Sequence, residues 1–298
     1  MTTQYISKEG AAIINIARYL MTTSVNDRLR TIDSLSEDIG VSVGFIQKAL
    51  STIEKQGAVV LSKQGRNGTF ISKLDYQALV KLAGFFHVVC AMPLPYTKHY
   101  EGLASGLKKQ IGDLPLYFAH MRGADVRAEC LKAGTYDIAI MSKLAAQTYS
   151  DSFVTAIDLG RNSYSHEHRL IYRSGEYDTI KKVGVDQDSP DQKILTQLVF
   201  EHKPVEIVEI NYADSLTHLL HGEIDAVVWL PEAIDMEKYG LTEQPLDHIK
   251  QCTLASEAVM LVSGEAPHIS TLLRKLINIP ELLDHQQQVV RGDITPSY

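Results

Sequence analysis

Residues 31–71 constrain the fold most strongly, because they combine two short helical patterns with a tight turn and a hairpin. In the first helical pattern Ile32, Leu35 and Ile39 recur three and four residues apart, so they share one face of a helix. Gly40 follows directly and can adopt the left-handed conformation that ends a helix. This segment is therefore predicted to be a short amphipathic helix that stops at a sharp turn.

A second helix is expected directly after that turn. Ser42 can cap its start, and Ile46, Leu50 and Ile53 form its apolar stripe. Two such stripes joined by a short turn make the helices cross steeply, which leaves the outer face of the second helix free to enter a DNA major groove. The residues expected on that face are Ser42, Gly44, Gln47, Lys48 and Ser51. Gln47 is the residue suited to a base edge, and Lys48 is suited to a phosphate.

A two-stranded hairpin is predicted after the second helix. Residues 58–62 and 69–72 are β-prone runs, and the six residues between them are rich in glycine and basic side chains. Such a hairpin is the wing of a winged helix-turn-helix domain. Its residues expected at DNA are Lys63, Arg66 and Asn67, and a winged helix that binds protein instead is the alternative.

Residues 27–71 resemble the winged-helix domain of the GntR class of bacterial repressors. The resemblance runs from Asp27-Arg-Leu-Arg-Thr31 to Gln64-Gly-Arg-Asn-Gly-Thr-Phe-Ile71. That class usually has an Arg where Val43 stands and a Thr where Phe45 stands, and both tend to face DNA. The resemblance therefore implies DNA binding but leaves the target sequence open.

Charge is distributed unevenly along the chain, whose formal net charge is −7. Residues 1–75 carry a net charge of +2, and the remainder carries −9. An acidic body would repel DNA, so contact is expected through the head alone.

No apolar run approaches the ~20 residues that span a bilayer, and no secretory leader is evident at the N-terminus. Cys90, Cys130 and Cys252 are odd in number and lack the spacing of metal ligands. These features predict a cytoplasmic protein without a membrane partner.

From about residue 85 onward, strand-like runs alternate with amphipathic helices, which is typical of an α/β architecture. The pattern occurs twice. Residues 124–140 and 213–228 each begin with Ala-Asp, continue to Leu and Gly at the end of a helix, and then place Asp before an aliphatic strand. This internal similarity predicts two similar lobes.

Two such lobes resemble the type 2 periplasmic-binding-protein-like fold and the effector domains of LysR-type regulators. The predicted fold class is α/β, a two-lobed body of this type with an N-terminal winged helix-turn-helix domain. We expect the head at residues 1–75 and the effector-binding domain at 76–298. The first lobe is expected at about 85–172 and 255–298, and the second at about 173–254.

Three stretches are similar to a more specific family, the bacterial YhfZ proteins. They are Val89-Cys-Ala-Met-Pro-Leu-Pro-Tyr96, Tyr100-Glu-Gly-Leu-Ala-Ser-Gly-Leu-Lys108 and Ala119-His-Met-Arg-Gly-Ala-Asp125. The resemblance extends over the whole chain. It implies a regulator with a winged head and a binding-protein-like body, and it supplies no ligand.

In open α/β lobes a ligand lies beyond the carboxyl ends of the parallel strands. The residues expected at those ends are Met92, Pro93, Tyr96, Arg122, Gly123, Ser142, Asp186, Ser189, Tyr212 and Trp229. Arg122 is suited to gripping a carboxylate or phosphate, unless it pairs with a local acid such as Glu129. Ser142 and Ser189 can donate to an anion or simply cap helices, and Tyr96 and Trp229 can form walls.

Other chemistry is weakly indicated. His166 and His168 alternate along an extended run and offer at most two metal ligands, so no metal site is expected. The sequence has no Gly-x-Ser-x-Gly elbow, phosphate-binding loop or dinucleotide-binding turn. We therefore predict no catalytic residues and no cofactor.

The sequence predicts a transcriptional regulator that binds DNA as a homodimer and responds to a small polar, anionic effector held between two lobes. A dimer is expected because one short helix rarely reads enough base pairs alone. The alternatives are an enzyme on the same scaffold with an accessory head, and an assembly protein whose cleft is empty and apolar.

Overall fold

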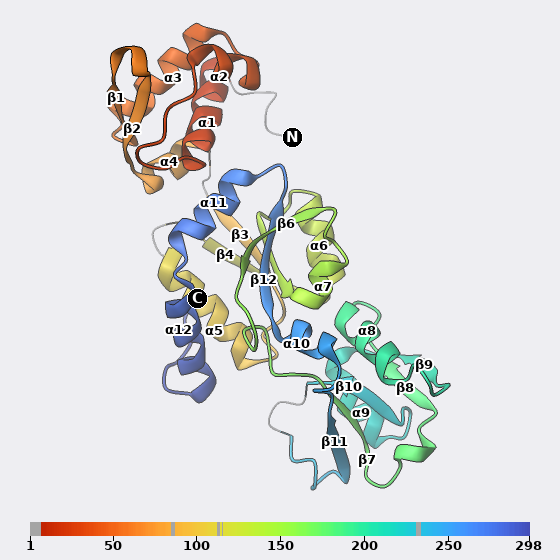
Figure 1. The fold of residues 1–298 in the computed structure, drawn as a ribbon. Helices are drawn as coiled ribbons and strands as arrows, with labels where there is room; N and C mark the ends of the chain where they lie inside the picture. Colours follow the sequence, from red (N-terminus) through yellow and green to blue (C-terminus); the bar gives the residue numbers. More distant parts are fainter. Residues whose placement is uncertain (1–6, 85–86, 112–113, 115, 231–233) are drawn as a thin grey trace. The chain divides into compact units, whose positions relative to one another are not determined.

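The computed structural model describes residues 7–84, 87–111, 114, 116–230 and 234–298 (Figure 1). The described residues form two compact units. The first contains the N-terminal helices, a hairpin and the C-terminal helix α11 (Pro267–Leu276), and the second contains two five-stranded sheets.

The first unit contains the predicted helix-turn-helix and wing. Its elements are α1 (Lys8–Met21), α2 (Ile32–Ile39), α3 (Val43–Lys55), β1 (Val59–Lys63), β2 (Thr69–Leu74) and α4 (Tyr76–Leu82). Leu35, Ile46 and Ile53, which belong to the two predicted apolar stripes, are buried in its core. Gly40 ends α2 with a φ of 74°, as the sequence predicted.

The caps of the two helices differ from each other. The Thr31 hydroxyl accepts a hydrogen bond from the Ser34 N–H and caps α2. Ser42 stands at the N-cap position of α3 in an extended conformation, but its side chain makes no capping hydrogen bond. The expected cap is therefore absent, and the Ser42 side chain is exposed at the start of the helix.

The wing is an antiparallel pair whose register runs from Val59 opposite Leu74 to Lys63 opposite Thr69. A 3-10 turn, η2 (Gly65–Asn67), forms its tip. Helix α11 packs within this unit, where the Lys275 ammonium donates to the Thr23 carbonyl at 2.6 Å.

The first sheet of the second unit has the strand order β4-β3-β5-β12-β6. Its strands are β3 (Val88–Met92), β4 (Leu116–His120), β5 (Ile138–Ser142), β6 (Phe153–Asp158) and β12 (Ala258–Ser263). β3 and β5 are parallel, whereas β12 runs antiparallel to both β5 and β6. Its helices are α5 (Lys98–Ile111), α6 (Ala124–Lys132), α7 (Lys143–Gln147) and α12 (Ile279–Arg291).

Helices α5 and α12 lie side by side in Figure 1, and two glycines allow their close approach. A Cβ atom at Gly102 would lie 2.9 Å from the Gln286 Cα, and one at Gly106 would lie 2.6 Å from a Leu282 methyl group. The helix pair therefore cannot accept larger residues at these positions without shifting.

The second sheet has the strand order β11-β7-β10-β8-β9. Its strands are β7 (Arg169–Arg173), β8 (Lys182–Val185), β9 (Glu206–Glu209), β10 (Ala226–Trp229) and β11 (Leu241–Pro245). β8 is parallel to β9 and β10, and β7 runs antiparallel to β10 and β11. Its helical segments are η3 (Tyr177–Thr179), α8 (Pro190–Val199), η4 (Tyr212–Asp214), α9 (Ser215–Leu220) and α10 (Lys250–Ser256).

The aspartates of the internal repeat have the same role in both sheets. The Asp137 carboxylate accepts from the Val89 N–H at 2.9 Å, and the Asp137 N–H donates to the Val89 carbonyl at 3.0 Å. Asp225 makes the equivalent pair of bonds with Lys182, both at 2.8 Å. Each aspartate therefore joins a central strand to the start of its parallel neighbour.

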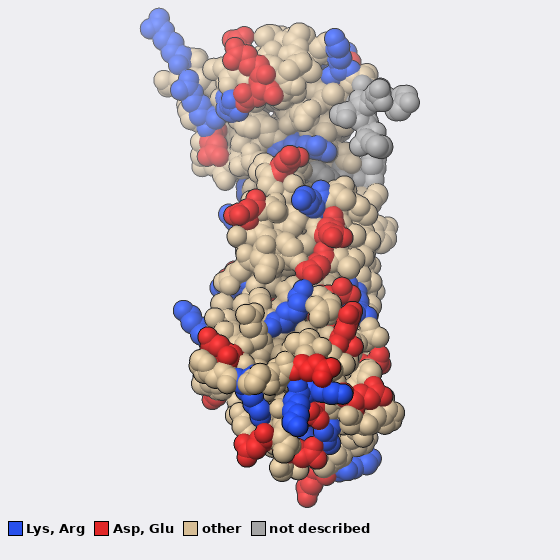
Figure 2. All heavy atoms as spheres, turned by 90° about the vertical axis from the view of Figure 1, so that its right-hand side faces the viewer, with Lys and Arg blue, Asp and Glu red and all other residues tan. Residues whose placement is uncertain are grey.

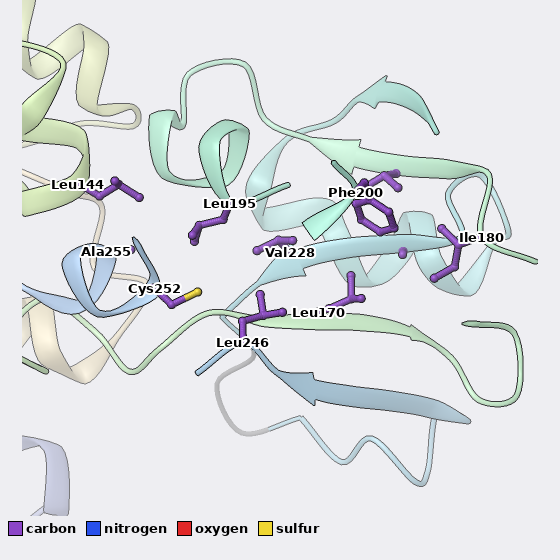
Figure 3. Close-up of a cluster of buried hydrophobic side chains, with 11 residues drawn as sticks. Leu144, Leu170, Ile180, Leu195, Phe200, Val228, Leu246, Cys252 and Ala255 are labelled. Atoms are coloured by element: carbon purple, nitrogen blue, oxygen red, sulfur yellow. The ribbon is translucent and has the colours of Figure 1, made fainter. Parts of the chain in front are cut away.

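An apolar cluster connects the second sheet with helices around it. Figure 3 shows Leu144 of α7, Leu195 of α8 and Cys252 of α10 in one cluster with Leu170 and Val228 of the sheet. All five side chains are buried. Because Leu144 follows a strand of the first sheet, the cluster links the two lobes of the second unit. The fold class predicted from the sequence, a two-lobed α/β body with an N-terminal winged helix-turn-helix domain, is confirmed.

Candidate functional sites

A cavity of about 80 Å³ lies in the second unit, where the carboxyl ends of strands from both sheets meet. It is lined by Pro93, Leu94, Tyr96, Tyr100, Met121, Arg122, Gly123, Ala124, Arg127, Tyr164, His168, Asp186, Asp188, Ser189, Pro190, Asp191, Tyr212 and Leu230. Residues after β3, β4, β8, β9 and β10 all contribute, which is the position expected for ligands in open α/β sheets.

Seven of the ten predicted ligand residues line this cavity and three do not. Those that line it are Pro93, Tyr96, Arg122, Gly123, Asp186, Ser189 and Tyr212. Met92, Ser142 and Trp229 are buried, and none of them lines it. Trp229 instead packs edge-on against the Tyr212 ring, with the centroids 6.5 Å apart, and so supports the cavity wall.

Arg122 joins the two lobes across the cavity. Its Nη2 atom donates to Asp186 at 3.0 Å and to Asp188 at 3.3 Å, and its Nη1 atom donates to the Asn211 amide oxygen. The predicted local partner, Glu129, takes no part in these contacts. The Asp186 hydrogen bond raises the pKa of Arg122, so the guanidinium remains charged.

Asp186 is the most enclosed carboxylate of this group, with 2% of its surface exposed. Besides Arg122 it accepts from two backbone N–H groups, those of Tyr212 and Asp188, both at 2.9 Å. These three charge-assisted or backbone contacts satisfy a buried carboxylate. Asp186 therefore holds the loops after β8 and β9 together while it binds Arg122.

The two serines act as helix caps. Ser142 accepts from the Ala145 N–H at 3.0 Å and caps α7, and Ser189 accepts from the Gln192 N–H at 3.3 Å and caps α8. Ser142 also donates to the Asp191 carboxylate at 2.6 Å. The sequence left two roles open for these serines, that of a donor to an anion and that of a helix cap. Both side chains act as helix caps here.

Asp191 was missed by the sequence analysis, although it lies in the first turn of α8. Burial raises the pKa of its carboxyl group to about 6, despite the opposing hydrogen bond from Ser142 and the charge of Arg127. The sequence signal that could have found Asp191 is its position directly after Pro190, in the first turn of the helix that Ser189 caps.

Arg127, Tyr164 and His168 are further cavity residues that the sequence did not indicate. The Arg127 guanidinium is buried and donates to the Ile140 carbonyl at 3.0 Å, to the Met121 carbonyl at 2.9 Å and to the Tyr164 hydroxyl at 3.3 Å. Burial lowers the pKa of His168 to about 4, so its imidazole is neutral near pH 7. No periodicity marks these residues, because they reach the cavity through tertiary packing.

In the first unit, the residues that are predicted to face DNA are all exposed to solvent. Those on α3 are Ser42, Gly44, Gln47, Lys48 and Ser51, and those on the wing are Lys63, Arg66 and Asn67; all eight are exposed. The Lys48 ammonium also lies 2.8 Å from the Glu9 carboxylate of α1. Phosphate binding by Lys48 would therefore compete with this ion pair.

Charge on the face shown in Figure 2 is mixed rather than segregated. Figure 2 shows Lys and Arg side chains interspersed with Asp and Glu on the face in view. Among the described residues no group of three or more His, Cys, Asp or Glu side chains is arranged to hold a metal ion. No described helix is long and apolar enough to cross a membrane.

Comparison with known proteins gives two family matches and a full-length relative. Residues 75–298 match the YhfZ C-terminal domain, and residues 25–71 match a helix-turn-helix domain. The protein YhfZ of Escherichia coli (strain K12) is 44% identical over 301 residues, which cover 100% of both chains.

Solved structures agree with this match. The crystal structure of YhfZ from Shigella flexneri is 45% identical with a TM-score of 0.68, over 74% of this chain and 97% of that one. The periplasmic aliphatic sulphonate binding protein SsuA from Escherichia coli has a TM-score of 0.52 at 12% identity, over 70% of this chain and 74% of that one. The latter similarity concerns the fold alone. The chain belongs to the YhfZ family, with a helix-turn-helix domain preceding the family's C-terminal domain.

Proposed function

We propose that this protein is a ligand-responsive transcriptional regulator. The head, a GntR-like winged helix at residues 1–75, binds DNA as a homodimer in the cytoplasm. The body, residues 76–298, binds a small polar effector with an anionic group between its lobes. A DNA-binding domain joined to a binding-protein-like domain is the combination that such a regulator requires.

The observation that carries this proposal is the pairing of an exposed α3 face with a cavity that is built from two lobes and lined in part by charged side chains. Gln47 and Lys48 are exposed on α3, where a recognition helix presents its contacts to a major groove. In the other unit, Arg122 and Asp186 connect the lobes across the cavity at 3.0 Å. A ligand that enters there must alter that connection, and so it can favour one arrangement of the lobes.

Regulation also needs the effector to distinguish two conformations, because a ligand with equal affinity for both shifts nothing. A five- to 150-fold change in DNA affinity corresponds to a coupling free energy of roughly 1–3 kcal/mol. One charge-assisted hydrogen bond contributes about 1.5–3 kcal/mol. Exchange of a single Arg122 contact for a ligand contact is therefore large enough to account for a coupling free energy of this size.

One observation favours the enzyme alternative, namely the raised pKa of Asp191, because perturbed acids gather at catalytic sites. Its carboxylate, however, is occupied by the Ser142 hydroxyl, and Ser142 in turn caps α7. Nucleophilic catalysis needs a base within hydrogen-bond reach of the nucleophile. Among the described residues the Nδ1 atom of His168 has no hydrogen-bond partner, so this atom does not activate a nucleophile. The regulator is therefore better supported than the enzyme.

The apolar, empty cleft expected of an assembly protein is not what the cavity resembles. Its lining includes the charged groups of Arg122, Asp186 and Asp188. Because burying charged groups away from water is costly without a partner, such a lining suits a polar ligand better than a collapsed interface.

The experiment that tests the proposal is titration of the full chain onto its own upstream DNA, beside a scrambled duplex, at two salt concentrations. Preferential and salt-sensitive binding to the upstream DNA is expected. Equal affinity for both duplexes at both salt concentrations would leave the head as a protein-contact module and contradict the proposal.

A further inference from the structure

The charges that line the cavity do not favour a simple anion. Three carboxyl groups, those of Asp186, Asp188 and Asp191, face two guanidinium groups, those of Arg122 and Arg127. A monoanion would enter a site whose charge is already negative whenever Asp191 is ionised. A ligand that carries one positive and one negative group would leave the balance unchanged.

Two polar atoms in the cavity wall are buried and lack a hydrogen-bond partner among the described residues. They are the Nε atom of Arg122 and the Nδ1 atom of His168. Guanidinium N–H groups only donate, so Arg122 Nε calls for an acceptor such as an acid oxygen. His168 is 97% buried, because only 3% of its surface is exposed, and it lines the same cavity. These atoms provide a place for the anionic end of a ligand.

The second lobe offers a place for the cationic end of a ligand. Asp188 is half exposed, and its carboxylate is held by Arg122 at the longer of the two contacts, 3.3 Å. The rings of Tyr96 and Tyr212 line the same cavity and are stacked, with their centroids 6.5 Å apart. Carboxylates beside tyrosine faces suit an ammonium group, which gains from both ion pairing and the ring quadrupole.

We infer, resting on the proposed function, that the effector is a small zwitterion. Its acid oxygens face Arg122 Nε and His168, and its ammonium group faces Asp188 beside Tyr96 and Tyr212. The Arg122 guanidinium contacts Asp188 at 3.3 Å, so the incoming ammonium takes over part of that contact. The cavity volume of about 80 Å³ suits a small ligand.

The test uses pairs of ligands that differ only in the amino group. Thermal unfolding of the full chain is measured with β-alanine beside propionate, and with taurine beside ethanesulfonate; ethylamine serves as the cation alone. A ligand that binds the folded state raises Tm. At least one amino acid is expected to raise Tm more than its partner without the amine, and ethylamine is expected to have no effect.

Variants identify the groups responsible. Asp188→Asn should weaken binding of the zwitterion about tenfold and remove its advantage over the simple acid. The control is Asp178→Asn, which neutralises an exposed carboxylate outside the cavity and should leave the preference intact. If the Asp188→Asn variant kept the full preference for the zwitterion over the simple acid, the assignment of the ammonium site would be overturned.

Three other results contradict the inference itself. These are equal or stronger stabilisation by propionate and ethanesulfonate, stabilisation by ethylamine alone, and stabilisation by none of the five compounds. The titration onto upstream DNA, performed without these compounds, tests the proposed function separately. Zwitterion binding without DNA binding would therefore reject the regulator and keep the ligand class.

Discussion

The Arg122 guanidinium and the Asp186 carboxylate meet at 3.0 Å, although 64 positions separate them in the sequence. Arg122 follows β4 of the first sheet, whereas Asp186 follows β8 of the second. Asp186 is buried and Arg122 is partly exposed, so the ion pair lies at the border between protein interior and solvent. In the proposed regulator, it is the contact through which a ligand in the cavity would act on both lobes.

Replacement of Arg122 by Ala should abolish any rise in Tm that an acidic ligand produces. The variant loses the buried Nε–H donor and the charge that faces the ligand, and affinity should fall about tenfold or more. The measurement is thermal unfolding with and without ligand. Arg291→Ala is a suitable control, because Arg291 pairs with Asp293 on the surface; unchanged ligand stabilisation in Arg122→Ala would remove Arg122 from the site.

Gly123→Ala should destabilise the protein and weaken ligand binding together. Gly123 has a φ of +79°, and an added Cβ would lie 2.9 Å from the Asp188 Cβ and 3.2 Å from its carbonyl oxygen. The backbone strain alone costs about 1–3 kcal/mol, and the contact should in addition push the loops of the two lobes apart.

Gly134→Ala is the control for this substitution. Gly134 also has a positive φ, +69°, but an added Cβ would meet no atom within 4 Å. Chemical denaturation and a ligand titration should show a loss of stability in both variants and a loss of affinity in Gly123→Ala only. Equal affinities in the two variants would argue against close contact between these loops in the bound state.

In the head, Lys48→Ala and Arg66→Ala should each weaken binding to every DNA sequence and reduce the salt slope by about one unit. Both side chains are exposed, on α3 and at the wing tip respectively. Affinity is measured over a range of salt concentrations. Lys132→Ala, which removes an exposed charge from α6 in the other unit, should change neither slope nor affinity; an unchanged slope in both head variants would exclude this docking face.

Gln47→Ala should instead relax discrimination at one base pair and leave the salt slope unchanged. An exposed Gln on a recognition helix can form a bidentate contact with adenine, which contributes about 1–3 kcal/mol of discrimination. The measurement compares upstream DNA with single-base substitutions across the site. Uniform weakening at all positions would show that Gln47 contacts the backbone instead.

Stability should decrease as the pH falls from 6.5 to 4. Burial lowers the pKa of His168, His99 and His268 to about 4 each, below the ordinary value of about 6.5. The unfolded chain therefore binds these protons first, and folding loses free energy across that range. Asp191 has the opposite effect, since its raised pKa, about 6, favours the folded state as the carboxyl protonates.

Denaturation at several pH values checks this balance. His168→Gln should reduce the loss between pH 6.5 and 4 by up to about 3 kcal/mol. Asp191→Asn should make the loss steeper, because it removes the offsetting group. The same pH profile in both variants as in the parent would contradict these pKa assignments.

The sequence predicted the elements and most of the strand-end residues of the cavity. This succeeded because Pro93, Arg122 and Asp186 follow apolar strands directly, and the ends of parallel strands meet at one edge of a sheet. Local patterns also predicted Gly40 at the end of α2. Turn and strand signals of this kind depend on neighbouring residues only.

What the sequence could not provide were partners across the fold. Arg122 was considered with Glu129, seven residues away, but its acid partners lie in the loop that follows β8 of the other sheet. Ser142 was considered for the ligand, but it contacts Asp191, 49 positions later. His168 reaches the cavity from the segment before β7, and one sequence gives no information on that path.

The repeated aspartates have a mechanical consequence. Asp137 and Asp225 each join a central strand to its parallel neighbour through one side-chain and one backbone hydrogen bond, so each sheet sets its own register without help from the other. In the proposed regulator, a ligand that moved one lobe relative to the other would leave both registers intact, and its binding would rotate two stiff bodies rather than deform them.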